Sequence, residues 1–583
     1  MAIGFETTPS EGTSDAQFLT QLTFDDDAPR RLVKAAKKQD ITRFVLVYRA
    51  WLEPVATRFR KRLLSPVLNL LTLTEPTQLA ELIREHIGKK ATLKCGLGRA
   101  VKAWLQSCRP QSLDPADRLL AVEMILNPPV DIEVETWCRL WRLVLVSSGG
   151  KPSKNQQSLV PIEMEVDFLR SLLFAPLKGA SPQNLKTAAD IESLLLTATD
   201  TDGTPHATAL NSVGKWFAGI VRCAWWARAF RVTLFGEDGR ARFKLLTERV
   251  AGLSRADGSF AMELAGTQPI GSELLPMAAK LAGIGKKTPV GRLATFDRQS
   301  KPESSVPSSH SDWGQIAHLR SNLQTKADQA VVRFDGGVPS LELCSFGKPL
   351  VSGKWNSKFT SADRVVSFRK WSCSCWYSDE DGDYVEIESK SGGVRLERSL
   401  YLSRVDHFAV LTECVRTTNA RPFQYETQLP LAQNVMSRAD YVSREWRLHT
   451  ANTPARVFPV CLEFDRVQNA NGECTVRDEV MVLNVQGERA VAASLVFDWH
   501  RKRTELPAEW NRLTVTENRE LVPPSDAAAF RLRIGKRHQI VSYRNISDSI
   551  EHRAVLGQHT NREMTLGLLG KSGIFEPLVL VDA

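Results

Sequence analysis

The spacing of apolar residues is helical from Ile41 to Ala282. In "ITRFVLVYRAWLEPVATRFRKRLL" and "VETWCRLWRLVLVSS", aromatic and aliphatic side chains recur at steps of three and four residues, with arginines between them. This spacing is typical of an amphipathic helix. Pro, Gly and Ser cluster between such runs and end them. The pattern predicts a stack of about eight to twelve helices.

The pattern changes at residues 286–312, which are rich in Pro, Ser and Lys and have no sustained period. Beyond this segment, apolar residues alternate with polar ones or form short runs bounded by Gly, Asn, Asp and Pro, as in "DQAVVRF", "SLELCSF" and "HFAVLTECV". Such runs are typical of β-strands. Because no helical pattern separates them, they predict antiparallel sheets packed face to face.

These patterns predict an α+β chain with a helical N-terminal half and a large antiparallel β-sandwich in the C-terminal half. A chain of 583 residues is longer than one hydrophobic core usually serves. The expected division is a polar tail over residues 1–30, a helical domain over 31–285, a linker over 286–312 and the sandwich over 313–583.

The composition is that of an ordinary soluble globular protein, with 43% hydrophobic and 24% charged residues. The formal net charge of +10 favours attraction to a polyanion at long range. We find no long apolar run and no N-terminal export signal, so we expect a cytoplasmic protein that does not enter a membrane. The ten cysteines have no repeated spacing, which indicates reduced thiols rather than a disulfide framework.

Two segments only partly match known motifs. In "AGIGKKT" (residues 282–288) the glycine that a phosphate-binding loop needs is replaced by Lys280, and the segment follows a helix instead of a strand. "DEDGD" (residues 379–383) has the acidic residues of a calcium loop without its glycine and glutamate positions. We therefore predict no nucleotide site at the first segment and a hairpin turn at the second.

Cys373 and Cys375 are two residues apart on a predicted strand, so their thiols should face the same side. Two thiols alone do not complete a zinc site, and no CxxC or HxxxH partner occurs elsewhere. We interpret both as structural thiols, and we expect no bound metal and no other cofactor.

The segment "TDGTPHATALNSVGKWFAGIVRCAWWARAF" is the best candidate for a ligand site. A loop with Asp202 and His206 leads into a helix whose apolar stripe forms a core face. The stripe consists of Trp216, Ile220, Cys223, Ala227 and Phe230. The basic and aromatic residues on the other faces are Lys215, Arg222, Trp225 and Arg228. A cation beside an aromatic ring suits a carboxylated sugar, although a solvated basic face with one packed tryptophan explains the same residues.

Several strings resemble the heparinase II/III-like polysaccharide lyases. They are "DGTPHATALNSVGKWFAGIVRCAWWARA", "LSRADGSFAM", "AVVRFDGGVPSLELCSFGKPLVSGKW", "CWYSDEDGDYVEIESKSGGVRLERSLYLSRVDHFAVLTECV" and "RAVLGQHTNREMTLGLLGKSGIFEPLVLVD". The resemblance covers the chain from about Asp202 to its end. It implies an incomplete (α/α) toroid joined to a β-sandwich, with the ligand in the cleft between the two halves and β-elimination on uronate-containing glycans.

The resemblance also implies chemistry for which residues are missing here. In the lyases a tyrosine follows the Asp-Gly pair, where this chain has Ser212, and histidines with an aspartate hold zinc on the first sandwich strands. The matching stretch, Val331–Trp355, lacks a His-x-His-x-Asp motif and has Ser352 near the next acidic position. We therefore expect the strands that form the site to be present and the side chains that would bind zinc to be absent.

Three functions remain open. The first is a heparinase-like protein that binds an acidic polysaccharide or another polyanion, with nucleic acid disfavoured, and whose lyase catalysis is degenerate or replaced. In it Asp202, Lys215, Arg222, Trp225 and Arg228 bind the substrate, and His206 is the catalytic candidate. The second is an active lyase that combines His206 with Tyr384 or Tyr401. The third is an intracellular scaffold without a carbohydrate ligand.

Overall fold

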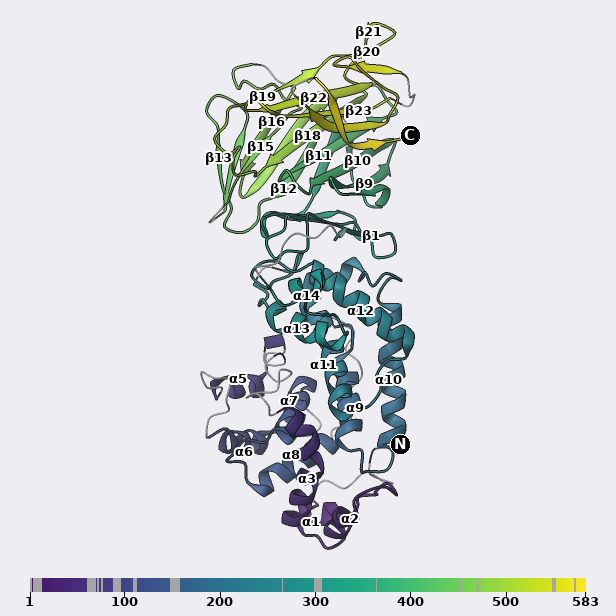
Figure 1. The fold of residues 1–583 in the computed structure, drawn as a ribbon, viewed down its shortest axis with the longest axis vertical. Helices are drawn as coiled ribbons and strands as arrows, with labels where there is room; N and C mark the ends of the chain where they lie inside the picture. The colour runs from purple at the N-terminus through teal and green to yellow at the C-terminus, as the bar shows by residue number, and fades with distance from the viewer. Residues whose placement is uncertain are drawn as a thin grey trace. The chain divides into compact units, whose positions relative to one another are not determined.

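The chain forms two compact units in the computed structural model (Figure 1). The helical unit consists of Met1–Gly203, Asn211–Val250 and Glu263–Lys286, and the sandwich unit consists of Thr204–Leu210, Ala251–Met262 and Lys287–Ala583. The structure describes residues 3, 13–59, 70, 73–74, 77–86, 96–108, 113–146, 158–264, 266–297, 307–362, 364–450, 453–468, 471–547, 552–570 and 573–582.

The described residues contain thirteen α-helices, one of which, α1, lies in the segment expected to be a polar tail. Among these residues, no helix combines the length and apolar character needed to cross a lipid bilayer. The helices are α1 (Asp15–Thr20), α2 (Arg30–Lys37), α3 (Ile41–Phe59), α5 (Gln78–Glu85), α6 (Leu97–Ser107), α7 (Pro115–Leu126), α8 (Val134–Val146), α9 (Ile162–Leu173), α10 (Ala180–Thr197), the 3-10 helix η2 (Ala207–Ser212), α11 (Val213–Phe230), α12 (Glu237–Gly252), α13 (Gly271–Leu281) and α14 (Pro289–Ala294).

Aromatic residues fill the core of the helical unit. The Tyr48 ring on α3 lies 5.3 Å from the Trp141 ring on α8, and the Trp141 ring lies 5.3 Å from that of Phe174. Both contacts are edge-to-face, which is a favourable geometry for aromatic pairs. The hydroxyl group of Tyr48 donates a hydrogen bond to the Leu173 carbonyl at 2.9 Å. The aromatic residues of these helices therefore form the packed core that the helical pattern predicted.

The sandwich unit contains antiparallel strands in five sheets. The orders are β1-β2-β3-β4-β5, β13-β14-β15-β18-β11-β10-β9-β8, β16-β17-β12-β6-β7, β19-β22-β23-β26-β27 and β21-β20-β24-β25. The strands are β1 (Ser309–Ser311), β2 (Ile316–Arg320), β3 (Gln329–Arg333), β4 (Ser340–Ser345), β5 (Lys348–Lys354), β6 (Asn356–Ser361), β7 (Arg364–Val366), β8 (Ser372–Ser378), β9 (Gly382–Ser391), β10 (Val394–Ser403), β11 (Phe408–Thr417), β12 (Phe423–Pro430), β13 (Met436–Ala439), β14 (Trp446–Thr450), β15 (Thr453–Phe458), β16 (Gly472–Arg477), β17 (Val480–Gly487), β18 (Ala490–Asp498), β19 (Ala508–Leu513), β20 (Val515–Glu517), β21 (Glu520–Leu521), β22 (Ala527–Ile534), β23 (His538–Asn545), β24 (Arg553–Val555), β25 (Gln558–Thr560), β26 (Met564–Leu569) and β27 (Phe575–Val581).

The eight-stranded sheet is buried on both faces. Val385 and Leu411 point into a core shared with β2–β5, β12 and β17, whereas Tyr384 and Val410 point into a second core shared with β22, β23 and β26. Successive residues of a strand point to opposite faces. The predicted α+β architecture of helices followed by antiparallel sheets is confirmed, and its sheets lie on both sides of one central sheet.

Two tight turns can be compared with the sequence, one within Val331–Trp355 and one at residues 379–381. The β4–β5 turn consists of Phe346 and Gly347. Gly347 has a φ of +72°, and a Cβ atom there would lie 2.7 Å from the Thr325 carbonyl oxygen, so glycine is required. Residues 379–381 connect β8 to β9, as the interpretation of "DEDGD" as a hairpin turn predicted.

Candidate functional site

Helix α11 carries four of the predicted ligand residues, and its apolar stripe is buried as expected apart from the partly buried Phe230. Arg222, however, is 1% exposed. Its Nε and Nη2 atoms donate hydrogen bonds to the two carboxylate oxygens of Glu165 at 2.6 and 2.7 Å, and Nη1 donates to the Thr74 hydroxyl at 3.1 Å. The expected placement of Arg222 on a ligand-accessible face is therefore wrong, because the helix is enclosed on that side too.

Trp225 and Arg228 lie near the C-terminal end of α11, beside Lys280 of α13. The Lys280 ammonium group lies 5.7 Å from the centre of the Trp225 ring, and Arg228 donates a hydrogen bond to the Lys280 carbonyl at 3.3 Å. Trp225 is half-buried, and Arg228 is exposed. Among the four predicted ligand residues on α11, Trp225 and Arg228 are the two that lie next to Lys280, a further cation.

Arg228 also lines a cavity of about 400 Å³ within the helical unit. The cavity, which we call the basic hollow, has Arg228 and Arg240 in its wall and is also lined by Phe235 and Phe243. Both arginines are exposed, whereas both phenylalanines are buried. An apolar lining with guanidinium groups at its edge can hold a ring and bind its carboxylate or sulfate group in a bidentate manner.

Of the five predicted ligand residues in the helical unit, Arg228 lines the basic hollow, and the other four do not. The Asp202 carboxylate accepts a hydrogen bond from the Arg249 guanidinium at 2.8 Å, so it forms an ion pair within the unit. Lys215 is half-buried in the first turn of α11. The six predicted residues therefore do not form one cluster.

His206 belongs to the sandwich unit, in the segment Thr204–Leu210. The Ala207 amide donates a hydrogen bond to the Gly314 carbonyl, which fixes this segment against the turn between β1 and β2. The His206 ring lies 5.6 Å from the Trp313 ring in an edge-to-face arrangement, and Trp313 is 45% exposed. An exposed indole beside an imidazole is a surface on which a sugar ring can stack.

The hydrogen bonds of His206 favour one of its two neutral tautomers. Its Nδ1 atom accepts a hydrogen bond from the Thr208 amide at 3.2 Å and lies 2.9 Å from the Thr208 hydroxyl oxygen. A nitrogen that accepts an amide hydrogen bond carries no proton, so Nε2 carries the proton of the neutral ring. In this tautomer the free Nε2 edge of His206 is a hydrogen-bond donor.

Neither tyrosine proposed as a partner of His206 is accessible. Tyr384 and Tyr401 are 0% and 1% exposed, and their hydroxyl groups donate hydrogen bonds to a Glu386 carboxylate oxygen and to the Asp381 carbonyl. Burial raises the pKa of both phenols far above the ordinary value. The pairing of His206 with Tyr384 or Tyr401 in an active lyase does not fit this structure.

The stretch Val331–Trp355 does not fit a zinc ion. Its acidic residues are Asp335, which pairs with Arg333 at 2.8 Å, and Glu342. The Glu342 carboxylate accepts hydrogen bonds from Arg255 at 2.8 and 2.6 Å and from the Met262 amide at 2.8 Å. Guanidinium and amide groups already neutralise these carboxylates, so the zinc implied by the family resemblance has no ligand set at this position.

A β-bulge changes the direction of the two cysteines on β8. Cys373 pairs with Ile387 and Cys375 pairs with Glu386, with Ser374 as the extra residue between them. Cys373 therefore packs against the core that contains Ile387, and Cys375 packs against the opposite core. The prediction that both thiols face one side is wrong, because it assumed a regular strand.

Cys373 lies beside His310 of β1 and Asp312 of the following turn. One possible ligand atom from each residue lies within 4.8 Å of the other two, and His310 Nε2 is 3.4 Å from Asp312 Oδ1. Burial, with a smaller effect of the Asp312 carboxylate, raises the pKa of the Cys373 thiol to about 12. His206, His310, Asp312, Trp313 and Cys373 are called the hairpin group below.

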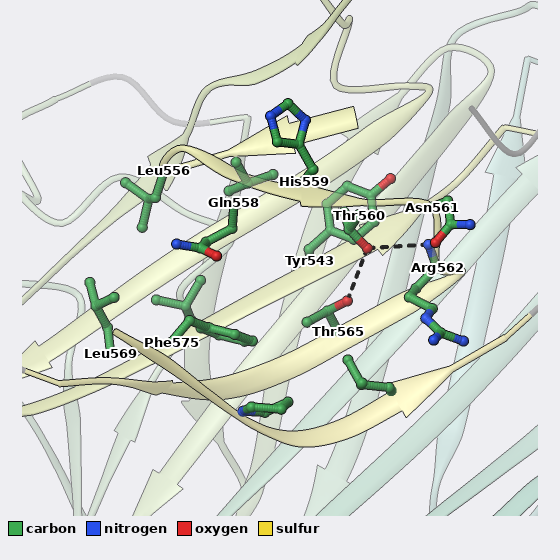
Figure 2. Close-up of a pocket in the computed structure, with 14 residues that line it drawn as sticks. Tyr543, Leu556, Gln558, His559, Thr560, Asn561, Arg562, Thr565, Leu569 and Phe575 are labelled. Atoms are coloured by element: carbon green, nitrogen blue, oxygen red, sulfur yellow. Dashed lines mark hydrogen bonds between the residues drawn. The ribbon is translucent and has the colours of Figure 1, made fainter. Parts of the chain in front are cut away.

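A second hollow, of about 400 Å³, lies in the C-terminal part of the sandwich unit (Figure 2). The strands β23, β26 and β27 and the β24–β25 hairpin line it. Tyr543 and Phe575 give it aromatic walls, and Gln558 and Arg562 are among its polar residues. Such a lining is typical of small-molecule pockets. Most of its lining residues lie in the string "RAVLGQHTNREMTLGLLGKSGIFEPLVLVD" that resembles the lyases, but that resemblance did not predict a pocket there.

Comparisons with known proteins agree with the architecture. No family model matches the chain, and no curated protein sequence matches it. A mutant of a heparan sulfate lyase from Pedobacter heparinus is similar in structure with a TM-score of 0.60 at 10% identity, over 92% of this chain and 100% of that chain. A heparinase III is similar with a TM-score of 0.54 at 11% identity, over 76% and 80% of the two chains. Another heparinase III gives 0.51 at 8% identity, over 92% and 84%.

The chain therefore has a distant heparinase-like, polysaccharide-lyase-type fold. The resemblance found in the sequence strings is confirmed at the level of the fold. At about one identical residue in ten, these similarities describe the architecture and not the chemistry.

Proposed function

We propose that this protein binds an acidic, uronate-containing polysaccharide, and that the eliminative catalysis of the lyases is lost or replaced in it. The observation that carries this proposal is the basic hollow, where Arg228 and Arg240 flank a cavity lined by buried aromatic rings. The net charge of +10 would add long-range attraction to the same class of ligand.

The chemistry of the basic hollow suits acidic sugars better than neutral ones. A guanidinium group forms two parallel hydrogen bonds to a carboxylate or a sulfate, which is stronger and more directional than a contact with a lysine ammonium group. Phe235 and Phe243 contribute to the apolar lining, which would complement the carbon-bound hydrogens of a sugar ring. Trp225 and Lys280, close to Arg228, would extend such a surface.

Loss of β-elimination is supported by the residues that the reaction would need. A base must remove the proton next to the uronate carboxylate, and an acid must protonate the leaving oxygen. His206 presents a donor edge, Ser212 stands where the lyases have a tyrosine, and Tyr384 and Tyr401 are buried. A ligand in a cleft between the two halves, and a cytoplasmic location, stay predictions.

Glycan binding tests this proposal. The whole protein is passed over heparin, chondroitin sulfate, hyaluronan and alginate at low salt and then eluted with a salt gradient. We expect retention on at least one glycan that is lost at high salt, since ion pairs between exposed groups are screened. The ultraviolet absorbance of an unsaturated uronate product should not rise.

Two double variants separate specific binding from net charge. Arg228→Ala with Arg240→Ala removes the arginines of the basic hollow and should weaken glycan binding by about 10-fold or more. Arg84→Ala with Arg99→Ala removes the same charge from exposed positions on α5 and α6, and should change binding by less than about 3-fold. Equal losses in both would contradict a specific site, and accumulation of unsaturated product would support an active lyase instead. Absence of both binding and product would leave the scaffold function.

A further inference from the structure

His310, Asp312 and Cys373 offer a nitrogen, an oxygen and a sulfur to one point in the sandwich unit. Their ligand atoms lie within 4.8 Å of one another, and His310 and Asp312 already approach to 3.4 Å. In a tetrahedral zinc site with bonds of about 2.0 to 2.3 Å, neighbouring ligand atoms lie about 3.3 to 3.8 Å apart. The three ligand atoms would have to approach one another by about 1 Å or less to reach that geometry.

The strand irregularity in β8 is what brings the thiol to this point. Because Ser374 is an extra residue, Cys373 points to the same side of the sheet as Ile387 and Trp376, while Cys375 points to the opposite side. Bulges of this kind often redirect a side chain at a functional site. The thiol therefore faces the His310 ring, which stacks on Trp376.

The His310 ring has the support that a metal ligand needs. It lies parallel to the Trp376 ring, with centroids 5.5 Å apart and planes inclined by 22°, and it stacks on Phe334 at 6.4 Å and 16°. Contacts with these two rings restrict the direction of its nitrogen atoms, as the surrounding residues of metal sites usually do. Its side chain is 14% exposed.

The Asp312 carboxylate can change its position and is open to solvent. The Asp312 side chain is 80% exposed, so its carboxylate can move by the short distance that coordination requires, and solvent can reach the same point. Trp313, which follows directly, is also exposed and contacts His206. A fourth ligand position would thus remain open to water or to another small molecule.

We propose that His310, Asp312 and Cys373 bind one zinc ion with three protein ligands and one open position. A mixed set of imidazole, carboxylate and thiolate selects zinc over magnesium or calcium, which prefer oxygen ligands alone. This site uses none of the residues of Val331–Trp355, where the family resemblance places a zinc. It also does not depend on glycan binding, because the ion alone is the ligand.

Metal titration of the whole protein tests the site. After treatment with a chelator, zinc is titrated by calorimetry, and cobalt(II) is titrated by absorbance, since a cobalt–thiolate bond gives a charge-transfer band in the near ultraviolet. We expect one equivalent of zinc to bind, a thiolate band with cobalt, and a higher midpoint of thermal unfolding in the presence of zinc.

The two cysteines of β8 provide a matched pair of variants. Cys373→Ser should abolish the cobalt–thiolate band and lower zinc affinity by more than the roughly 10- to 100-fold that loss of a supporting contact costs. Cys375→Ser, two residues away on the opposite face, should keep the band and bind zinc within about 2-fold of the parent. His310→Gln should behave like Cys373→Ser, and His206→Ala should behave like Cys375→Ser.

Circular dichroism and thermal unfolding without metal show whether each variant is folded. If Cys373→Ser does not fold, His310→Gln replaces it in the test. In His310→Gln, zinc should no longer raise the midpoint of thermal unfolding. Absence of stoichiometric zinc binding by the parent protein would overturn the proposal, and so would a thiolate band that persists in Cys373→Ser or disappears in Cys375→Ser.

Discussion

Two groups of side chains in the sandwich unit differ strongly in their exposure to solvent. In the first, the Arg544 guanidinium pairs with Glu386 at 2.7 Å, Glu397 at 2.9 Å and Glu563 at 3.2 Å. Burial alone would raise the pKa of Glu386, but the Arg544 guanidinium outweighs it and lowers that pKa below its ordinary value. The second is the hairpin group, whose Asp312 and Trp313 are exposed.

This difference separates groups that hold the fold together from groups that can bind a ligand. The buried side chains of Arg544, Glu386 and Glu397 form ion pairs with one another, so removing Arg544 leaves both carboxylates without this cation. At the exposed members of the hairpin group, Asp312 and Trp313, solvent can replace what a substitution removes. Substitutions in the interior around Arg544 should therefore lower stability strongly. Substitutions of Asp312 or Trp313 should change stability only slightly and should change ligand binding instead.

The largest expected effect comes from the interior of the sandwich. Arg544→Ala should lower the free energy of unfolding by about 3 to 5 kcal/mol, because it leaves buried carboxylates without their cation. Arg533→Ala is the control, since its pairing with Glu509 is exposed and should contribute less than about 1 kcal/mol. Chemical denaturation of both variants measures the difference. A loss in Arg544→Ala as small as in the control would contradict the comparison.

The Arg222–Glu165 pair extends the comparison to the helical unit. Glu165→Leu alone should destabilise the protein by about 3 to 5 kcal/mol, because it leaves the buried Arg222 unpaired. The double variant Glu165→Leu with Arg222→Met should recover most of this loss, since apolar groups of similar volume replace the pair. Denaturation curves of the parent, of Glu165→Leu, of Arg222→Met and of the double variant give the coupling energy, and additive losses would show that the charges do not act as a pair.

A buried histidine should make stability depend on pH. Burial, with a further effect of the Arg503 guanidinium, lowers the pKa of His538 to about 4. The unfolded chain binds the proton near pH 6.5 and the folded chain only near pH 4, so stability should fall by on the order of 3 kcal/mol as pH drops through this window. His538→Gln should flatten this part of the profile, and substitution of the exposed His552 by Gln should not. An unchanged slope in His538→Gln would assign the acid sensitivity to other groups.

The smallest effect on stability is expected at the hairpin group. Trp313→Ala removes an exposed side chain and should change the free energy of unfolding by less than about 0.5 kcal/mol. If a glycan stacks on this indole, the same variant should weaken its binding severalfold. Thermal unfolding and glycan retention measured on one preparation separate the two effects. A stability loss of several kcal/mol would instead show that Trp313 packs as a core residue.

Sequence patterns were sufficient for the elements that are buried on both faces. Strands β9, β10, β11 and β18 are buried along most of their length, because the central sheet has cores on both sides. The sequences of β11 and β18 are mostly apolar, whereas β9 and β10 also carry buried charged residues such as Glu386 and Glu397. Short strands such as β21 and β25 gave no such signal, since two or three residues show no period.

The site was predicted less well, for two physical reasons. The helical period places Arg222 away from the main apolar stripe, but Phe217, Val221 and Trp226 make α11 apolar on nearly all sides, which is the pattern of an enclosed helix. The hairpin group joins residues that are distant in the sequence, and a bulge cannot be read from the alternation that it interrupts. Asp312 and Cys373 could be brought together only by the folded strands.

The irregularity at Ser374 also bears on the redox behaviour of the protein. A disulfide needs its two Cβ atoms about 3.8 Å apart with side chains directed toward each other, and Cys373 and Cys375 project into different cores. An oxidant that reached Cys373 would therefore find no resolving thiol at Cys375, and strand β8 would have to separate from β9 before the two sulfur atoms could join.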